Sequence, residues 1–327
     1  MPATLLDLGS TSSKAHVAER ILQMVFRYRR RPRGAHACEP ACSECRAPHL
    51  KRAQDFIARG EPIHFVLPAF PAKSPNRTKV LGTLPDFGES LALDFLQALC
   101  DRIRALYAPG ARITIGSDGR VFSDVVGVSD RDVTAYTAEL RRLIRERRAE
   151  SLDVFGLDDD APDLAPDARR LKLLADYGLP IEMLRVAVKT SQARLNARNG
   201  IARFLFEDLV TLEPATSRNA LRERANETAY SVLQRSMAWS ALLARRFPRA
   251  VRLSIHPQAG HEGKLGIHLL PSQDDWLTPW HGVAVDLGDR YVLMKRRQAE
   301  ALGAVLVTRE GRPSHFVLPS ADQELRQ

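Results

Sequence analysis

Apolar positions recur at helical spacing near the start of the chain. Between residues 14 and 30 they stand three or four positions apart, as on one face of a helix: Val17, Ile21, Leu22, Val25 and Phe26. A loop rich in proline, glycine and cysteine follows, to about residue 49. We therefore predict that residues 1–50 form an N-terminal appendage, made of one helix and a Cys-containing loop.

From residue 51 onward, short apolar runs alternate with amphipathic stretches. The expected strands are 63–67, 112–116 and 184–188, and the helices that follow them are 89–107, 130–149 and 200–210. Strands that alternate with helices of this length are typical of an α/β domain. We predict that residues 51–327 form this domain, with a Rossmann-like, largely parallel sheet flanked by helices, and that it holds any catalytic site.

The last third of the chain has a different pattern. A long helix is expected over 218–246, and after it come apolar runs at 251–256, 266–270, 283–286, 291–295 and 304–308. These runs predict a mixed-strand or antiparallel continuation of the sheet. Segment 157–167 is acidic and contains proline, so we expect an exposed linker there.

Composition narrows the class of protein. With 327 residues, 44% of them hydrophobic, the chain can bury a substantial core. It has no run near the roughly 20 apolar residues of a membrane span, and its first residues lack the pattern of a signal peptide. We expect a cytoplasmic protein without membrane contacts. Four cysteines in a chain of this size indicate reduced thiols rather than a disulfide framework.

The net charge of +9 permits binding to nucleic acid or to small anions. Acidic residues interleave with most of the excess arginine, for example over 139–150 and 222–235, as on solvated helix faces. The basic run 27–33 could contact a polyanion, but it fits the end of a helix better. Neither the strand pattern of RNA-binding modules nor a compact helix-turn-helix is present, so we expect no nucleic-acid partner.

Lysine is rare, with eight residues against forty arginines. Only lysine can lose its proton near neutral pH and act as a base or nucleophile. Ligands of open α/β sheets bind outside the carboxyl ends of the strands. Four lysines follow expected strand ends, and we single them out as candidates: Lys73, Lys79, Lys189 and Lys264.

The loop over 68–79 contains three prolines, which restrict its backbone. Its cations, amide and hydroxyls suit a sugar phosphate: Lys73, Ser74, Asn76, Arg77 and Lys79. A solvated loop is the alternative. The chain has neither the Walker A pattern nor the strand-linked G-x-G-x-x-G pattern, so we expect no nucleotide-binding site of either kind.

Acid and base candidates follow the other strands. Asp118 and Arg120 lie in an expected tight turn, and Asp124 comes six residues after Asp118. His256 ends an apolar run and His281 follows Trp280, and their side chains could transfer protons near neutral pH.

Three cysteines stand between two histidines, as His36, Cys38, Cys42, Cys45 and His49. Their spacing would suit an iron–sulfur cluster or zinc. They precede the first expected strand, whereas a radical-SAM loop would follow it. We therefore expect free thiols and no metal, and zinc is the alternative.

Several strings of the sequence together resemble the pyoverdine/dityrosine-biosynthesis family. They are residues 65–76 (FVLPAFPAKSPN), 79–82 (KVLG), 84–86 (LPD) with Glu89, 117–122 (SDGRVF), 252–256 (RLSIH) and 278–281 (TPWH). The resemblance covers about residues 40 to 318, and the bacterial members that are most similar are L-tyrosine isonitrile synthases. Relatives that act on L-tryptophan share these strings, so tryptophan is the alternative substrate.

The resemblance implies an enzyme that condenses the amine of L-tyrosine with ribulose 5-phosphate. The C2 carbon of the sugar would stay on nitrogen as the isonitrile carbon, while phosphate, formaldehyde and a three-carbon ketone leave. No external oxidant or organic cofactor is then needed. An iron and 2-oxoglutarate-dependent oxygenase is the expected partner in the next step. A metal-independent sugar-phosphate lyase or aldolase is the alternative enzyme class.

For this reaction we assign roles by residue type and position. Lys73, Ser74, Asn76, Arg77 and Lys79 would bind the phosphate and sugar hydroxyls. Lys189 and His256 would be the acid/base pair, with Asp124 as a further proton-transfer group and Lys264 as an alternative cation. The remaining substrate-binding candidates are Asp118, Arg120, Trp280 and His281.

Overall fold

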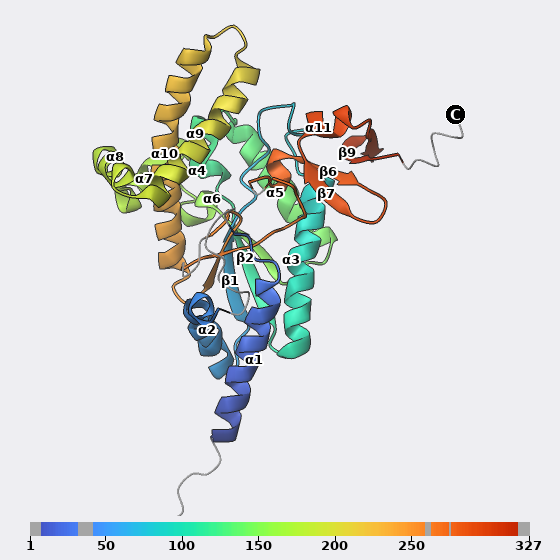
Figure 1. Ribbon diagram of the computed structural model, residues 1–327. Helices are drawn as coiled ribbons and strands as arrows, with labels where there is room; N and C mark the ends of the chain where they lie inside the picture. Colours follow the sequence, from blue (N-terminus) through green and yellow to red (C-terminus); the bar gives the residue numbers. More distant parts are fainter. Residues whose placement is uncertain (1–7, 32–41, 259–262, 275, 320–327) are drawn as a thin grey trace, which may run out of the picture.

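A five-stranded sheet forms the centre of the computed structural model, which describes residues 8–31, 42–258, 263–274 and 276–319 (Figure 1). Its strand order is β3-β2-β1-β4-β5, and all neighbouring pairs are parallel. The strands are β1 (Ile63–Pro68), β2 (Ala111–Gly116), β3 (Leu152–Phe155), β4 (Val251–Ser254) and β5 (Leu265–Gly266). The predicted α/β class with a largely parallel sheet is therefore confirmed.

The alternation of β1 explains how helices cover both faces of the sheet. Phe65 and Leu67 belong to one buried cluster, together with side chains of the helices on that face, whereas Val66 belongs to the cluster on the other face. The first face is covered by α1 (Leu8–Phe26), α2 (Ser43–Ala58), α3 (Phe87–Leu106) and α5 (Asp130–Glu146). The second face is covered by α7 (Pro166–Tyr177) and α10 (Arg218–Arg246).

The N-terminal helices are packed into this core. Ile21 and Leu22 of α1 and Phe56 of α2 are buried in the same cluster as Phe65. The predicted helix over 14–30 is confirmed, although it begins at Leu8 and ends at Phe26. Residues 32–41 of the expected loop lie outside the described residues, and its last part is wrong, because residues 43–49 belong to α2.

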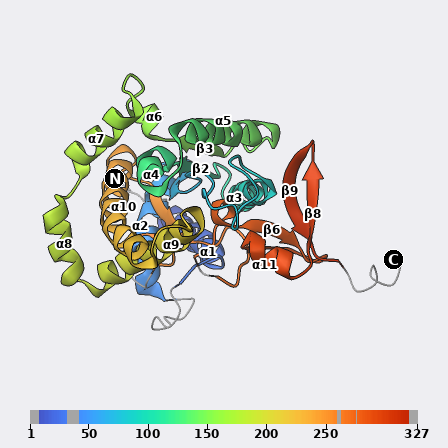
Figure 2. The ribbon, with the colours of Figure 1, turned by 90° about the horizontal axis from the view of Figure 1, so that it is seen from above.

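A second, mixed sheet has the order β7-β6-β9-β8. It consists of β6 (Val283–Asp286), β7 (Tyr291–Met294), β8 (Val305–Arg309) and β9 (Arg312–Val317), with α11 (Arg296–Ala301) between β7 and β8. The mixed-strand C-terminal part is thus confirmed, but it is a separate sheet, because only β4 and β5 extend the parallel one. Seen from above, α7 and α8 (Ile181–Lys189) lie on one side of the parallel sheet and the mixed sheet lies on the other (Figure 2).

The strand predicted at 184–188 is wrong, because these residues belong to α8. Leu184 and Val188 are buried, four positions apart, while Met183 and Val186 are exposed. That spacing places the two buried side chains on one face of a helix. A five-residue apolar run cannot by itself distinguish the two structures.

The acidic segment is also structured, contrary to the expected linker. It contains α6 (Leu157–Asp160) and the beginning of α7, and Leu157 is buried against α10. Asp158 forms ion pairs with Arg120 and Arg169. Segment 157–167 therefore belongs to the second face of the domain.

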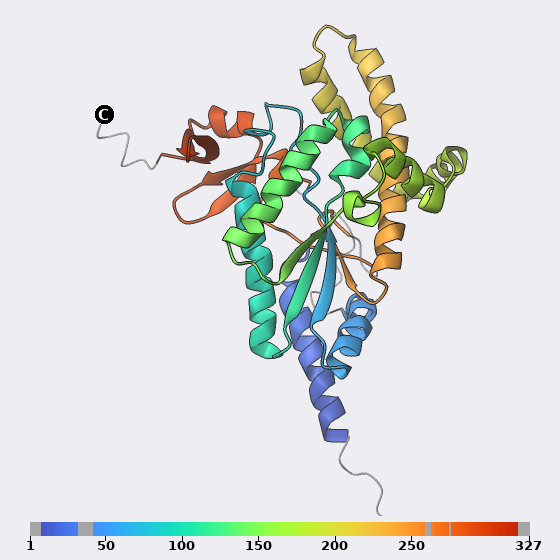
Figure 3. The same ribbon diagram turned by 180° about the vertical axis from the view of Figure 1, so that it is seen from behind.

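Two helices extend beyond the carboxyl edge of the sheet. They are α9 (Gln192–Leu212) and the first half of α10, which lie at the end of the molecule opposite α1 (Figure 3). The short helix α4 (Gly119–Val126) begins at the end of β2 and contacts α10. No helix among the described residues has the length and apolar character needed to cross a membrane.

Candidate active site

The carboxyl edge of the parallel sheet opens into a cavity of about 750 Å³. Its walls come from the loops after β1, β2 and β4, from the inner faces of α4, α9 and α10, and from segment 274–281. Parallel strands deliver their following loops to one edge, which is where open α/β sheets bind ligands. The cavity is therefore the candidate active site.

The loop after β1 approaches the start of α4 closely. A Cβ atom on Gly119 would lie 1.8 Å from the carbonyl oxygen of Pro71, so only glycine fits at this position. Phe70 has a φ of 57°, which is an unfavourable backbone region for an aromatic residue. Packing against Trp280, at 5.0 Å between ring centroids, and the hydrogen bond from the Ser117 hydroxyl to the Phe70 carbonyl hold this conformation.

Lys73 is completely buried, and carboxylates surround its ammonium group. Its Nζ lies 2.7 Å from Asp86 and 2.8 Å from Glu89, and it donates a hydrogen bond to the carbonyl of Pro279. Burial alone would lower the pKa of Lys73, but the two carboxylates raise it, so the side chain stays charged. Lys73 lines the cavity, but these three oxygen partners already engage its ammonium group, so the contacts do not support the predicted role in phosphate binding.

Lys79 occupies the cavity wall beside α9. Its Nζ lies 2.5 Å from Asp208 and 3.3 Å from Glu207, and 4.1 Å from the centre of the Phe204 ring. Asn76 donates a hydrogen bond to Asp208 as well, at 3.0 Å. The loop after β1 is thus attached to α9.

More positive charge gathers around Glu207. Lys295 donates a hydrogen bond to its carboxylate at 2.5 Å, and Arg297 lies 3.3 Å away. Burial opposes ionisation, but Lys295 and Lys79 lower the pKa of Glu207 below its usual value. Three cations and two carboxylates, from Glu207 and Asp208, leave this wall with a net positive charge.

Asp118 lies two residues after β2, at the N-cap of α4, and lines the cavity. Burial raises the pKa of this group to about 7. A carboxyl group that titrates near neutral pH can both accept and donate a proton during a reaction. Asp118 was predicted as a substrate-binding residue, and its environment also gives it the properties of an acid/base group.

His256 and Trp276 stand beside each other on another wall, with ring centroids 5.5 Å apart. The His256 ring is open to the cavity, yet desolvation, Arg30 and Lys264 lower its pKa to about 4. Burial and then Lys79 also lower the pKa of His281, which packs against Phe204 at 4.4 Å. Both imidazoles are therefore neutral at pH 7.

The remaining binding candidates are part of the wall or lie beside it. Trp280 is buried in the core and reaches the cavity, and its carbonyl accepts a hydrogen bond from the backbone N–H of Ser74. Ser74 lines the cavity, whereas Arg77 is exposed and lies outside the lining. Lys264 is half-buried next to β5, outside the lining, and acts on His256 through its charge.

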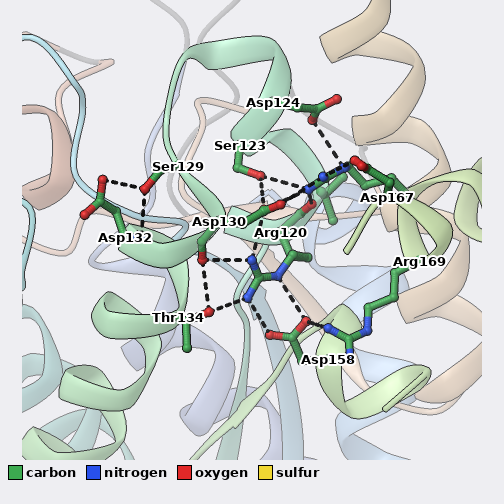
Figure 4. Close-up of polar contacts among 12 residues, drawn as sticks. Arg120, Ser123, Asp124, Ser129, Asp130, Asp132, Thr134, Asp158, Asp167 and Arg169 are labelled. Atoms are coloured by element: carbon green, nitrogen blue, oxygen red, sulfur yellow. Dashed lines mark hydrogen bonds and ion pairs between the residues drawn. The ribbon is translucent and has the colours of Figure 1, made fainter. Parts of the chain in front are cut away.

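Besides Arg77 and Lys264, three further predicted site residues lie outside the cavity lining. Lys189 is exposed at the end of α8. Arg120 is buried and binds Asp130 and Asp158, in a polar network that joins α4, α5 and α6 (Figure 4). Asp124 points away from that arginine and pairs with Arg235 and Arg170 (Figure 4). Arg120 and Asp124 thus stabilise the helices behind the cavity.

Sequence reasoning missed most of the walls built by α9 and α10. Apolar side chains from α4, α9, α10 and the turn after α4 line one part of the cavity: Phe122, Val126, Val128, Ile201, Leu205 and Val232. The acidic residues Glu207 and Asp208 stand three and four positions after Phe204 on α9. Their helical spacing was a usable signal for a common face, but nothing in the sequence showed which loop they contact.

The cysteine group gives no metal site among the residues that are described. Cys42 precedes α2, and Cys45 and His49 are buried within it. No cluster of three or more potential ligands occurs in the described part of the chain. His36 and Cys38 lie outside the described residues, so the expectation of free thiols stays a prediction for the complete group.

A second cavity, of about 660 Å³, opens at the amino ends of the strands. His64 and Arg112 line it, and Arg249 on its rim pairs with Glu61 and Asp55. It lies at the edge opposite the one where parallel sheets bind ligands. We therefore place the candidate chemistry in the first cavity.

Known proteins resemble this chain over most of its length. The family model described as pyoverdine/dityrosine biosynthesis protein matches residues 53–307. An L-tryptophan isonitrile synthase of Fischerella ambigua is 50% identical, over 98% of this chain and 97% of the relative. An L-tyrosine isonitrile synthase of Pseudomonas aeruginosa is 48% identical, over 92% and 94%. The crystal structure of the PvcA protein from Pseudomonas aeruginosa superposes with a TM-score of 0.88 at 47% identity, covering 92% of this chain and 99% of that one.

Proposed function

Because the chain belongs to the pyoverdine/dityrosine biosynthesis family and is an enzyme of the isonitrile synthase type, we propose that it converts the amino group of L-tyrosine into an isonitrile. Ribulose 5-phosphate is the proposed carbon donor. The alternative amino acid is L-tryptophan, on which a relative with 50% identity acts according to its name.

The proposed reaction balances without an external oxidant. The amine condenses with the C2 ketone of the sugar, and C2 stays on nitrogen. The sugar leaves as phosphate, formaldehyde and a three-carbon hydroxyketone, and one water is released. Loss of phosphate lets the sugar carbons redistribute electrons among themselves. The enzyme must bind a phosphate, move protons next to the imine and hold an aryl side chain.

The two chemically different parts of the cavity carry this proposal. One wall has a net positive charge from Lys79, Lys295 and Arg297. Another is apolar and comes from α4, α9 and α10. The positive wall suits a phosphate and the apolar wall suits an aryl group, as the proposed pair of substrates requires.

We assign the phosphate to the positive wall. Lys79, Lys295 and Arg297 supply the charge, and Asn76 keeps the loop with Lys79 in place through Asp208. Charge-assisted hydrogen bonds to phosphate are stronger than neutral ones. Lys73, in contrast, supports the loop from behind.

We assign proton transfer to Asp118 and His256, in place of the exposed Lys189. Asp118 titrates near pH 7, so it can take a proton next to the imine and return it to a leaving oxygen. The neutral His256 can orient a hydroxyl group of the sugar, with Trp276 packed against it.

The apolar part of the cavity would hold the aryl side chain. Phe122 and Val126 of α4, Ile201 of α9 and Val232 of α10 line it, and the exposed residue Ser236 of α10 lines the same cavity. A phenol or an indole could form a hydrogen bond with Ser236. Because this hydrogen bond does not distinguish the two side chains, activity with tyrosine and with tryptophan has to be compared by experiment.

Mass spectrometry of the purified enzyme with L-tyrosine and ribulose 5-phosphate tests the proposal. We expect a product heavier than tyrosine by one carbon and lighter by two hydrogens, and a ¹³C label at C2 of the sugar should appear in it. Product from tryptophan but not from tyrosine would select the alternative substrate. Consumption of the sugar phosphate without any amino acid would instead indicate a lyase or aldolase.

The same reaction mixture tests the expected cofactors and partners. We expect turnover without added nucleotide, flavin or SAM, and a strict need for SAM and a reduced iron–sulfur centre would contradict this. An isonitrile acid is an intermediate, so we propose that an iron and 2-oxoglutarate-dependent oxygenase consumes it. A cytoplasmic location fits a substrate that carries a phosphate, because such sugars do not cross membranes unaided.

A further inference from the structure

The segment that follows α1 lies directly behind the cavity. The backbone N–H of Arg30 donates to the carbonyl of Gly266 at 2.8 Å, and its carbonyl accepts from Gln258 at 3.2 Å. Arg29 forms a β-bridge with Ile267. A Cβ atom on Gly266 would lie 2.6 Å from the Arg30 carbonyl, so the approach of the two segments requires glycine. This part of the predicted appendage is therefore paired with the edge of the sheet.

The guanidinium group of Arg30 reaches two separate walls of the cavity. Its Nη1 donates to the carbonyl of Ile255 at 2.6 Å, and its Nη2 donates to the carbonyl of Leu277 at 3.1 Å. The carbonyl of Asp274 lies 3.5 Å from the same Nη2. Ile255 directly precedes His256, and the segment from Asp274 to Leu277 carries Trp276. One side chain, itself 3% exposed, thus connects the backbones that carry both rings.

We propose that Arg30 is a positioning residue of the active site, which fixes His256 and Trp276 relative to each other by holding the backbones of their two segments. The planar fork of a guanidinium group can bind two carbonyl groups at fixed angles, whereas an ammonium group provides a single point of charge. The proposal concerns the cavity wall itself. Only the activity measurements below rest on the proposed function.

The charge of Arg30 has a second, separable effect. Desolvation lowers the pKa of His256 first, followed by the positive charges of Arg30 and Lys264. The other groups that face this imidazole are the Trp276 ring and His281. Removing the Arg30 charge should therefore raise the pKa of His256, and replacing arginine with lysine should leave it nearly unchanged.

Three variants separate geometry from charge. Arg30→Lys keeps the charge and loses the fork, and Arg30→Met loses both. Arg27→Met, at an exposed position in the same segment after α1, is the control. Urea unfolding first establishes that each variant is folded under the assay conditions. Histidine NMR titration, with His256→Gln to assign the signal, then reports the pKa of His256 without any substrate.

We expect kcat to fall roughly 10- to 100-fold in both Arg30 variants, because a displacement of about 1 Å can cost this much. The His256 titration should move to higher pH in Arg30→Met only. Arg27→Met should match the wild type. Normal kcat in folded Arg30→Lys would overturn the proposal, and so would a titration of His256 that does not move in Arg30→Met. Absence of turnover in the wild type with any aryl amino acid would instead contradict the proposed function.

Discussion

At the scale of single residues, Asp118 is the side chain on which the proposed proton transfer depends. Asp118→Asn keeps the size of the side chain and removes its ability to titrate. We expect kcat at pH 7 to fall by roughly 10²–10⁴, the usual contribution of a positioned acid/base group. The exposed Asp153→Asn on β3 is the control and should stay within a factor of about two. Equal kcat values for the two variants would remove Asp118 from the mechanism.

The same substitution should lower kcat but raise the free energy of unfolding near pH 7. The pKa of Asp118 is about 7 in the folded protein and about 3.8 in an unfolded chain. Between these values the unfolded state has already lost its proton, so the stability of the wild type decreases as pH rises through this window. The D118N variant avoids this cost. Its advantage in urea unfolding should be small near pH 4, grow to roughly 4 kcal/mol by pH 7 and then level off. A constant difference across pH 4–8 would contradict the raised pKa.

Lys189 illustrates how position decides the role of a residue. If Lys189 were a catalytic base at a strand end, the enzyme would lose activity when arginine replaced it, because arginine stays charged near pH 7. The structure places Lys189 on the surface, at the end of α8. We therefore expect Lys189→Arg to have a normal kcat and a free energy of unfolding within about 0.5 kcal/mol of the wild type. A loss of kcat by a factor of a hundred would restore the catalytic hypothesis.

At the scale of elements, the positive wall depends on the meeting of α9 with the start of α11. Lys295 is the N-cap residue of α11 and Arg297 lies within the helix. Both side chains contact Glu207 of α9. Removing both with Lys295→Ala and Arg297→Ala should raise the KM for ribulose 5-phosphate by on the order of tenfold for each cation. The KM for tyrosine should change little.

Arg296→Ala is the matched control for this pair. Arg296 lies between the two cations on α11, and its side chain pairs with Glu300 outside the cavity lining. Steady-state kinetics at two salt concentrations will separate the variants, because screening weakens an interaction between exposed charges. An equal rise of KM in Arg296→Ala would show that the helix, rather than its charges, matters.

At the scale of the whole molecule, Lys73 connects the two sheets. It follows β1, binds Asp86 and Glu89 at the start of α3, and donates to Pro279 just before the mixed sheet. Tyr136 of α5 donates to Glu89 and joins this buried cluster. Lys73→Met would leave two carboxyl groups without their cation, so we expect the free energy of unfolding to fall by about 3–5 kcal/mol.

The exposed pair of Lys172 and Asp176 provides the comparison. Lys172→Met removes a surface ion pair, which contributes little because solvent screens both charges. Urea unfolding at pH 7 measures both variants. If Lys73→Met is no less stable than Lys172→Met and mainly raises the KM for the sugar phosphate, Lys73 has the binding role that its sequence position first indicated.

The sequence by itself determined the class of fold and indicated the edge of the sheet where the candidate site lies. Apolar runs at β1, β2 and β4 and the helical pattern of α3, α5 and α10 are local signals, and the structure confirms each of them. The family resemblance also came from the sequence. The strands β3 and β9 were missed, because their exposed and polar positions give a weaker apolar signal. The five-residue apolar run in α8 fitted a strand and a helix equally well.

Only the tertiary structure decided which side chains face the cavity. Lys73 and Lys79 stand six residues apart in one loop, but one is enclosed by α3 and the other reaches α9. Asn76 meets Asp208, and Arg30 meets Ile255 and Leu277, across more than a hundred residues of chain. Local sequence sets the type of charge and the element that carries it. Burial and pairing set what that charge can do, and they depend on which distant elements pack together.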